Sequence, residues 1–275
     1  MDFGKAKAST IIIVDCKDCH KKQHEVELKK FRTGFICRPC LESLHFKRFR
    51  YFFQAALKKN EPTCVYIVDD SSINTRYITK LLDQFIKEEK DHKIKNYDIE
   101  ICVLKKEVMN NIPIHLYERY IINNAKEHNG KTLLYLDSAS VSTKAARVLT
   151  AVSCGDVVTV PSVGYFHYTF PGLAVVRPVD FTDDEVAEYM LENNDVATSD
   201  GIFGACETFV KKLEVDYDQT GNAVISTAQR VVEDKEAKRC VLCMRPYVAF
   251  LNDCKDGKCR TCSKVVSEEV MKSLM

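Results

Sequence analysis

The chain has 275 residues and a formal net charge of +1, and hydrophobic residues make up 45% of it. This composition is ordinary for a protein that buries a core, and it excludes a disordered polymer, a collagen and a small disulfide-stapled domain. The charge is uneven, because residues 1–60 hold 14 Lys and Arg against 6 Asp and Glu, a net of +8, whereas the rest carries −7. A basic end on an acidic body predicts a local surface for a polyanion.

No apolar run in the sequence approaches the ~20 residues that a membrane span needs. The first such run, Ile11–Val14, has the length of one short strand. Residues 1–5 include an acid and are not followed by an adequate apolar core, so we expect no signal peptide and no membrane partner. A cytoplasmic chain is therefore expected. Its 13 cysteines then need an explanation other than disulfides, because cytosolic thiols stay reduced.

Eight of the cysteines form two sets with the same pattern. Each set is a CxxC pair, a spacer of 17 or 15 residues and a second CxxC pair. Two such turns aim four sulfurs at one point, and four protein ligands leave no open position for water. We therefore predict two structural zinc ions, each supplying on the order of 10 kcal/mol to the folding of a small lobe. The predicted ligands are Cys16, Cys19, Cys37 and Cys40 in the first set, and Cys240, Cys243, Cys259 and Cys262 in the second.

Other assignments of these cysteines stay open. Free thiols that only pack, or ligands of an iron–sulfur cluster, are alternatives for either set. Cys254 lies close enough in the sequence to replace Cys259, and His20 and His24 are alternative ligands for the first set.

Four further cysteines lie between the two sets. Cys64 and Cys102 lie in or beside apolar, strand-like runs, and we predict that they are small core residues. Cys154 and Cys206 each lie close to a glycine, but no base lies near them in the sequence, which disfavours a catalytic role.

A basic helix is predicted over residues 41–59, where apolar residues recur at helical spacing. One interpretation of its basic residues is a helix face exposed to solvent. The functional interpretation is that they contact the phosphate backbone of a nucleic acid. The predicted nucleic-acid contacts are Lys29, Lys30, Arg32, Lys47, Arg48 and Arg50.

The body of the chain alternates between apolar runs and helical patterns, which predicts an α/β fold with a parallel sheet and flanking helices. The expected strands are Cys64–Val68, Asp98–Leu104, Thr132–Leu136 and Val157–Val160. The expected helices are Ile73–Phe85, His115–Asn124 and Ser142–Val152. The predicted parts are an N-terminal zinc lobe with the basic helix (1–60), the α/β domain (61–235) and a C-terminal zinc lobe (236–275).

Ligands of such sheets bind beyond the carboxyl ends of the strands, here residues 69–72 and 137–140. A turn that grips phosphate needs glycine, and the sequence has none from Phe35 to Asn129. Two carboxylates instead repel a triphosphate, each by roughly 1 kcal/mol in water, unless a magnesium ion bridges them. The alternative is a pair of aspartates in a turn or helix cap. The residues of this degenerate loop are Asp69, Asp70, Ser71 and Ser72.

The arrangement resembles the cytoplasmic tRNA thiolation proteins of the PP-loop, or N-type ATP pyrophosphatase, superfamily. That superfamily marks its first strand–helix turn with Ser-Gly-Gly-x-Asp-Ser, and the equivalent Val65–Asn74 keeps the strand and loses both glycines. The stretch Leu136–Asp156 keeps a helix and a terminal Gly-Asp, but lacks the His of the family's Gly-His-Asn. Arg177–Met190 looks like the family's Arg/Lys-Pro-Leu helix start, and it leads to Thr198–Asp200, where a catalytic relative has its third Cys. The catalytic subunit also carries a mid-chain CxxC, which this sequence lacks.

A sequence that keeps the strand and helix pattern of this superfamily but lacks its catalytic residues resembles the tRNA 2-thiolation protein 2 family. The members of that family are the non-catalytic partner subunits. The resemblance implies a subunit, not itself an enzyme, of the heterodimer that 2-thiolates the wobble uridine of cytoplasmic tRNAs. It implies as partners the catalytic paralogue, tRNA and a ubiquitin-like sulfur carrier, with ATP not used by this chain. One alternative is an active ATP-dependent tRNA sulfurtransferase that uses Cys154 or Cys206. Another is a zinc-scaffold adaptor unrelated to tRNA.

Overall fold

The computed structural model describes residues 14–23, 25–32, 34–58, 61–92, 97–105, 114–125, 130–192, 201–217, 219–231, 237–247, 257–259 and 262. The chain divides into two compact units, residues 1–46 and 47–275, and the division falls within helix α1 (Arg38–Ala56). The boundaries expected after residues 60 and 235 stay a prediction. Among the described residues, no helix combines the length and the apolar character that crossing a membrane demands.

The first unit contains an antiparallel hairpin of β1 (Leu28–Phe31) and β2 (Gly34–Cys37), with Leu28 opposite Cys37. Phe31 and Ile36 are buried and supply its small core. The turn before the hairpin is tied to it by the Lys17 N–H, which donates to the Phe35 carbonyl at 2.9 Å. The run expected to be a strand at residues 11–13 lies outside the described residues.

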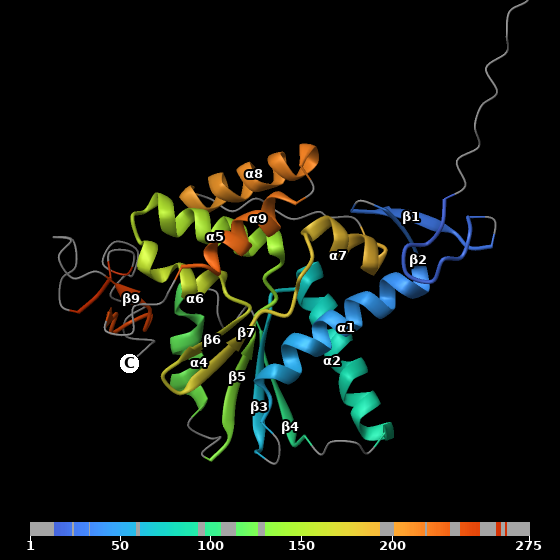
Figure 1. The fold of residues 1–275 in the computed structure, drawn as a ribbon. Coiled ribbons are helices and arrows are strands. Elements are labelled where there is room, and N and C mark those ends of the chain that lie inside the picture. Colours follow the sequence, from blue (N-terminus) through green and yellow to red (C-terminus); the bar gives the residue numbers. More distant parts are fainter. Residues whose placement is uncertain are drawn as a thin grey trace, which may run out of the picture. The chain divides into compact units, whose positions relative to one another are not determined.

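The second unit is built on a five-stranded sheet of order β4-β3-β5-β7-β6 (Figure 1). Four strands are parallel, and β6 pairs antiparallel with β7 at one edge. The strands are β3 (Thr63–Asp69), β4 (Ile99–Lys105), β5 (Thr132–Leu136), β6 (His167–Phe170) and β7 (Leu173–Val176). The predicted α/β class with a mostly parallel sheet is therefore confirmed.

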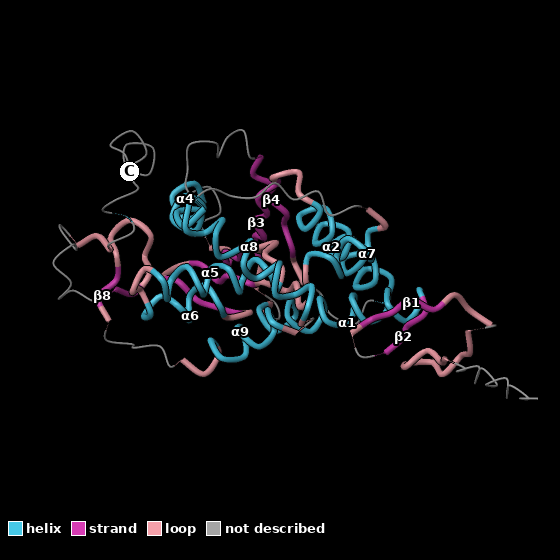
Figure 2. The backbone as a smooth tube through the Cα atoms, turned by 90° about the horizontal axis from the view of Figure 1, so that it is seen from above, coloured by secondary structure: helices cyan, strands magenta, loops and turns pink. Residues whose placement is uncertain are grey.

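Helices flank this sheet. They are α2 (Ile73–His92), η1 (Ile114–Leu116), α4 (Tyr117–Asn124), α5 (Val141–Ser153), η3 (Val157–Thr159), α6 (Val160–Gly164), α7 (Asp183–Met190), α8 (Gly201–Asp216) and α9 (Thr220–Ala228). A short β8 (Lys238–Arg239) and β9 (Pro246–Tyr247) form a ribbon near the C-terminus. The two views agree that α8 and α9 lie beside α5 (Figures 1 and 2).

The direction of the chain places helices on both faces of the sheet. The chain leaves β3 through α2 to reach β4, and then passes through α4 to β5 on the other side of β3. Right-handed crossovers in opposite directions put α2 and α4 on opposite faces. Leu116 and Ile121 accordingly pack in one hydrophobic cluster with Cys64 and Tyr66 of β3.

The same hydrophobic cluster includes the C-terminal cysteine set. Cys240, Cys243, Cys259 and Cys262 are all buried in it, together with Leu242 and Tyr247. The C-terminal segment therefore shares its core with this face of the sheet.

The expected strand Val157–Val160 is wrong, because these residues form η3 and the start of α6. Pro161 has no N–H to give to a sheet ladder, and it suits the first turn of a helix. The hydroxyl of Thr159 donates to the Asp156 carbonyl at 2.8 Å and supports the helical turn. The fourth parallel strand is β7, which the sequence analysis missed although its apolar run follows a Gly172 turn with φ of +83°.

Candidate functional site

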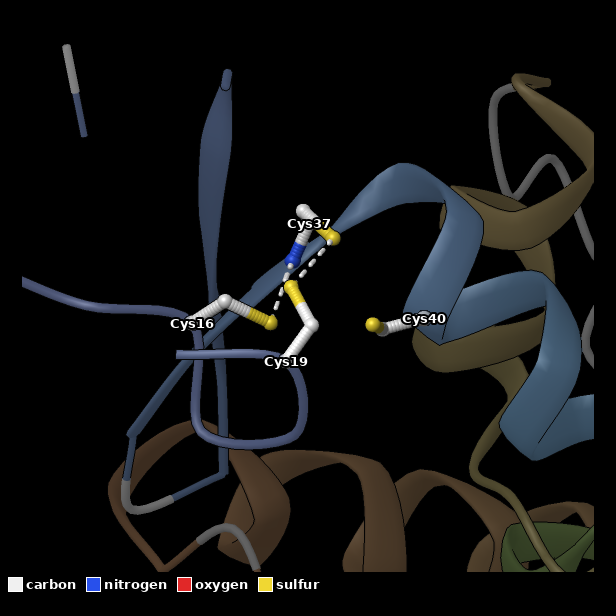
Figure 3. A group of neighbouring side chains, drawn as sticks. All are labelled: Cys16, Cys19, Cys37 and Cys40. Atoms are coloured by element: carbon white, nitrogen blue, oxygen red, sulfur yellow. Dashed lines mark hydrogen bonds between the residues drawn. The ribbon is translucent and has the colours of Figure 1, made fainter. Parts of the chain in front are cut away.

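The first four-cysteine set lies in the first unit and comes from a turn, a strand end and a helix start (Figure 3). Cys16 and Cys19 lie on a turn closed by the His20 N–H, which donates to the Cys16 carbonyl at 2.8 Å. Cys37 ends β2, and Cys40 lies in the first turn of α1. The Cys37 N–H donates to the Cys16 sulfur at 3.4 Å, and the sulfurs of Cys19 and Cys37 are 3.7 Å apart.

The C-terminal set repeats this local geometry. The Met244 N–H donates to the Cys240 carbonyl at 2.9 Å, just as the His20 N–H donates to the Cys16 carbonyl. His20 and Met244, each directly after its CxxC pair, both have φ of +59°. The Cys259 N–H donates to the Cys240 sulfur at 3.3 Å, and the sulfurs of Cys243 and Cys259 are 3.7 Å apart. The same backbone turn therefore occurs at both CxxC pairs, and in each it directs two cysteine sulfurs toward one point.

The structure thus brings together the eight predicted cysteines as two groups of four. Within each group all four sulfurs lie within 4.8 Å of one another. Thiolates at this spacing fit a metal, because four soft ligands around one point are a tetrahedral donor set. Each group could therefore hold a metal ion. Cys254 and His24 lie outside the described residues, and the part of the chain that is described places Cys259 in the second group.

The carboxyl ends of β3 and β5 form the topological switch point of the sheet. From β3 the chain continues to β4 on one side, and from β5 it continues toward β7 and β6 on the other side. The two predicted loops meet there. The hydroxyl oxygen of Thr75, at the start of α2, lies 3.3 Å from the hydroxyl oxygen of Ser138. Residues 69–72 and 137–140 are therefore adjacent, as expected for the ligand edge of such a sheet.

The first loop uses its own backbone donors. The Ser71 N–H donates to Asp69 Oδ1 at 3.0 Å, and the Ser72 N–H donates to Asp70 Oδ1 at 3.0 Å. Asp70 Oδ1 also accepts the Thr75 hydroxyl at 2.7 Å. Ser71 has φ of +58°, the left-handed region that glycine enters without strain. The aspartates thus close a turn, which is the cap interpretation of these residues.

The second loop is held by a buried ion-pair group around Asp137. Its carboxylate accepts Arg147 Nη1 at 2.6 Å, Arg177 Nε at 2.9 Å and the Ala139 N–H at 3.1 Å. Burial alone raises the pKa of Asp137, but the positive charges of Arg147 and Arg177 outweigh it and hold that pKa well below its usual range. Asp137 is therefore ionised in the folded protein at neutral pH.

A second acid links this group to the C-terminal cysteines. Glu118 of α4 accepts Arg245 Nη2 at 3.1 Å and lies 3.9 Å from Arg177 Nη2. The Arg245 carbonyl accepts the Cys240 N–H at 2.9 Å. Charged contacts thus run without interruption from the C-terminal turn to Asp137.

Glu118, Arg147 and Arg245 had no predicted role from the sequence alone. Arg177 was noted only as part of a family-like stretch. The available signals were weak: an arginine on the apolar helix Ser142–Val152, and another directly after the Leu173–Val176 run. Only the folded chain shows that these positions converge.

The predicted nucleic-acid contacts differ in their surroundings. Lys29 and Lys30 lie on β1, and Arg32 lies over the ring of Phe31 at 5.3 Å. Lys47 is exposed on α1. The other two are Arg48, at 3.7 Å from Asp180, and Arg50, at 3.4 and 3.0 Å from Glu88 and Glu89.

The remaining cysteines are partly or fully covered. Cys64 is buried on β3 and its sulfur lies 3.1 Å from that of Cys102 on β4. Cys154 follows the end of α5 and Cys206 lies on α8, and both are half-buried. The Thr198–Asp200 stretch lies outside the described residues.

The fold was compared with those of known proteins. No family model matches the chain, and no curated protein does. A solved structure, the U34-tRNA thiolase NcsA from Methanococcus maripaludis with its [4Fe-4S] cluster, is similar with a TM-score of 0.57 and 16% sequence identity. The likeness covers 89% of this chain and 95% of that chain. This chain therefore has the fold of a tRNA thiolase, with a four-cysteine group near each end.

Proposed function

We propose that this chain is the non-catalytic subunit of a heterodimer that 2-thiolates the wobble uridine of cytoplasmic tRNAs. It stabilises a catalytic paralogue and contributes contacts to tRNA. The solved thiolase that shares its fold acts, by its name, on U34 of tRNA. That likeness covers 89% of this chain, which supports the thiolation class over a simple zinc adaptor.

The observation that carries the non-catalytic role is the self-bonded loop after β3. A phosphate cradle needs backbone N–H groups that point at the anion. Here the N–H groups of Ser71 and Ser72 already donate to Asp69 and Asp70, each at 3.0 Å. A nucleotide phosphate at this turn displaces two hydrogen bonds and meets two carboxylates.

Zinc is the metal that we propose for both groups. A Zn–S bond of about 2.3 Å in a tetrahedron places neighbouring sulfurs about 3.8 Å apart. The sulfurs of Cys19 and Cys37, and those of Cys243 and Cys259, are 3.7 Å apart. A four-iron cluster bonds each cysteine to a different iron and therefore holds the sulfurs farther apart than one ion does. When bound, the ion braces the turns and supplies no reacting group.

The alternative function is an active sulfurtransferase. The fold-sharing thiolase is itself an enzyme, and this observation favours it. Such a role requires ATP at the loop after β3 and a sulfur carrier such as Cys154 or Cys206. Both thiols are half-buried, and a sulfur carrier has to be reached by its donor.

The test is affinity purification of the tagged full chain from its own cells, with mass spectrometry of bound protein and sequencing of bound RNA. We expect a paralogue with an intact Ser-Gly-Gly-x-Asp-Ser turn, together with tRNA. Depletion of the chain should lower 2-thiouridine in tRNA. Recovery of neither a paralogue nor tRNA, with thiolation unchanged on depletion, contradicts the proposal and favours an adaptor.

A further inference from the structure

We propose that the N-terminal cysteine group is an oxidation-sensitive metal site. Cys19 reacts there with hydrogen peroxide, and the group then releases its zinc ion, whereas the C-terminal group keeps its own. The inference rests on the zinc assignment made above. It deepens the proposed function, because it names a way in which the chain is regulated.

The two groups differ in how far their cysteines are covered. In the N-terminal group Cys19 is exposed and Cys40 is half-buried. In the C-terminal group each of the four cysteines is 2% exposed or less. An oxidant has to reach the sulfur that it attacks, and accessible thiolates are the reactive ones. The N-terminal group therefore offers a thiolate to a small oxidant, and the C-terminal group shields its thiolates.

The surroundings of the two groups differ as well. The C-terminal cysteines lie in the hydrophobic cluster that includes Tyr66 of β3 and Tyr135 of β5, so exposing them disrupts the core of the second unit. The N-terminal group belongs to the small first unit, where Phe31 and Ile36 supply the core of the hairpin. A small unit with few buried apolar residues opens at a lower free energy than a large core. The first group can therefore react while the sheet stays intact.

Charge adds to the protection of the C-terminal group. Four thiolates around a divalent ion leave a net negative charge. The buried guanidinium of Arg245 interacts electrostatically with Cys243 and Cys262. A positive charge beside a thiolate stabilises it and lowers its nucleophilicity. The C-terminal thiolates are therefore both less accessible and less reactive.

The oxidation joins two neighbouring sulfurs. Those of Cys19 and Cys37 are 3.7 Å apart (Figure 3). A coordinating thiol is deprotonated, so Cys19 attacks peroxide as a thiolate: an S–O bond forms, the O–O bond breaks and hydroxide leaves. The Cys37 thiolate then attacks the sulfur of this sulfenic acid: an S–S bond forms, the S–O bond breaks and a second hydroxide leaves. The two sulfurs together lose two electrons, which the peroxide accepts, and the metal loses two of its ligands.

Release of the ion acts on the predicted contacts with tRNA. Lys29 and Lys30 lie on β1, and Arg32 follows that strand, all within the first unit. A small metal-braced unit loses its order together with its metal. Oxidation of Cys19 therefore weakens the contribution of this unit to tRNA binding, and reduction with zinc restores it.

The experiment uses the zinc-loaded full chain and hydrogen peroxide. Released zinc is followed with a chromophoric chelator, and the remaining thiols are alkylated and mapped by mass spectrometry. We expect release of about one zinc ion of about two, because only the group with an exposed thiolate reacts. The map should show a disulfide between Cys19 and Cys37, with the C-terminal cysteines alkylated after denaturation. A reductant with added zinc should restore the metal content.

Two matched variants make the same ligand exchange in the two groups. Histidine is also a zinc ligand, so Cys19→His and Cys243→His should each keep the metal and lose one thiolate. Cys19→His should release zinc about ten times more slowly than wild type, because the accessible thiolate is gone. Cys243→His should release its N-terminal zinc at the rate of wild type. If Cys19→His loses its metal, the disulfide map of wild type decides alone.

Zinc loss from both groups at equal rates, earlier loss from the C-terminal group, or a disulfide map without Cys19 would overturn the inference. So would an N-terminal group that holds no zinc, or one that keeps it while free cysteine in the same solution is oxidised. The assay contains no tRNA, partner or ATP. Its failure therefore leaves the roles in tRNA binding and in the heterodimer standing, and failure of the purification test leaves the oxidation of Cys19 standing.

Discussion

Ser71 shows at one position how the turn after β3 differs from a phosphate cradle. Its φ of +58° lies in a region that costs an L-residue roughly 1–2 kcal/mol relative to glycine. The turn keeps this conformation because the Ser71 N–H is bonded to Asp69. The turn therefore has a left-handed backbone conformation at Ser71, but its N–H groups donate to the protein's own carboxylates.

Glu214 should make stability fall as pH rises from about 4.5 to about 7. Burial raises its pKa from 4.5 to about 7; the Ser142 hydrogen bond opposes this rise and nearby acids add to it. The folded state therefore keeps a proton that the unfolded state has released in this window, so the free energy of unfolding decreases there with pH.

The Glu214→Gln variant removes this penalty. We expect it to be more stable than wild type at pH 8 by about 1 kcal/mol, a value reduced for solvent screening of a half-buried group. Urea unfolding at pH 4.5 and 8 measures the effect, with the exposed Asp216→Asn as control. A variant whose pH dependence matches wild type contradicts the assignment.

Single cysteine substitutions should separate the two metal sites. Wild type is expected to carry about two zinc ions, and Cys16→Ser or Cys243→Ser should each remove about one, because four-thiolate ligation loses a ligand. Cys64→Ser, outside both groups, is the matched control. Elemental analysis of the purified chain gives the counts. Iron with inorganic sulfide in place of zinc would contradict the zinc assignment.

At the scale of elements, α1 combines two kinds of basic residue. Arg50 is paired with Glu88 and Glu89 of α2, whereas Lys47 is exposed. Charge reversal at Arg50 therefore places like charges together and should destabilise the fold whether or not RNA binds. A variant that reverses Lys47, Arg48 and Arg50 together would therefore confuse unfolding with lost tRNA binding.

Lys47→Glu is the cleaner test of the basic helix. If Lys47 contacts a phosphate, the variant should weaken tRNA binding and lower the slope of log K against log salt by about 1, with its melting temperature unchanged. Filter binding by the purified complex at several salt concentrations measures this, with Lys212→Glu at an exposed position of α8 as the control. An unchanged slope would show that Lys47 does not contact a phosphate of the tRNA.

The sequence predicted most elements, because buried strands and amphipathic helices carry a local pattern. Thr132–Leu136 matches β5, and Cys64–Val68 lies within β3. Val157–Val160 failed because four apolar residues fit a strand or a helical turn, and the following proline decides between them. The cysteine groups were predictable from spacing alone. The Asp137 group was not, because its members come from separate elements and meet only in the fold.

At the scale of the second unit, the C-terminal cysteines and the ligand edge belong to one structure. The cysteines share a hydrophobic cluster with β3 and β5, the strands that lead to this edge. Charged contacts among Arg245, Glu118, Arg177 and Asp137 connect the cysteine turn to the edge itself. A metal ion bound at the C-terminal group would order the turn that carries Arg245. Loss of that metal should therefore loosen the edge of the sheet as well as the turn.

Hydrogen exchange before and after chelation tests this coupling. We expect faster amide exchange at residues 137–147 once metal is removed, and α2, on the other face of the sheet, should serve as the internal reference. The Arg245→Gln variant should show the faster exchange even with metal bound. Exchange confined to residues 237–247 contradicts coupling between the two regions.

We expect the turn after β3 to hold no nucleotide. Equilibrium dialysis of the metal-loaded full chain with radiolabelled ATP and magnesium is the decisive measurement. Binding should not saturate up to millimolar ATP, because the amides of Ser71 and Ser72 are already bonded and two carboxylates would face the phosphates. Saturable binding in the micromolar range, lost on changing Asp69 and Asp70 to Ala, would contradict it.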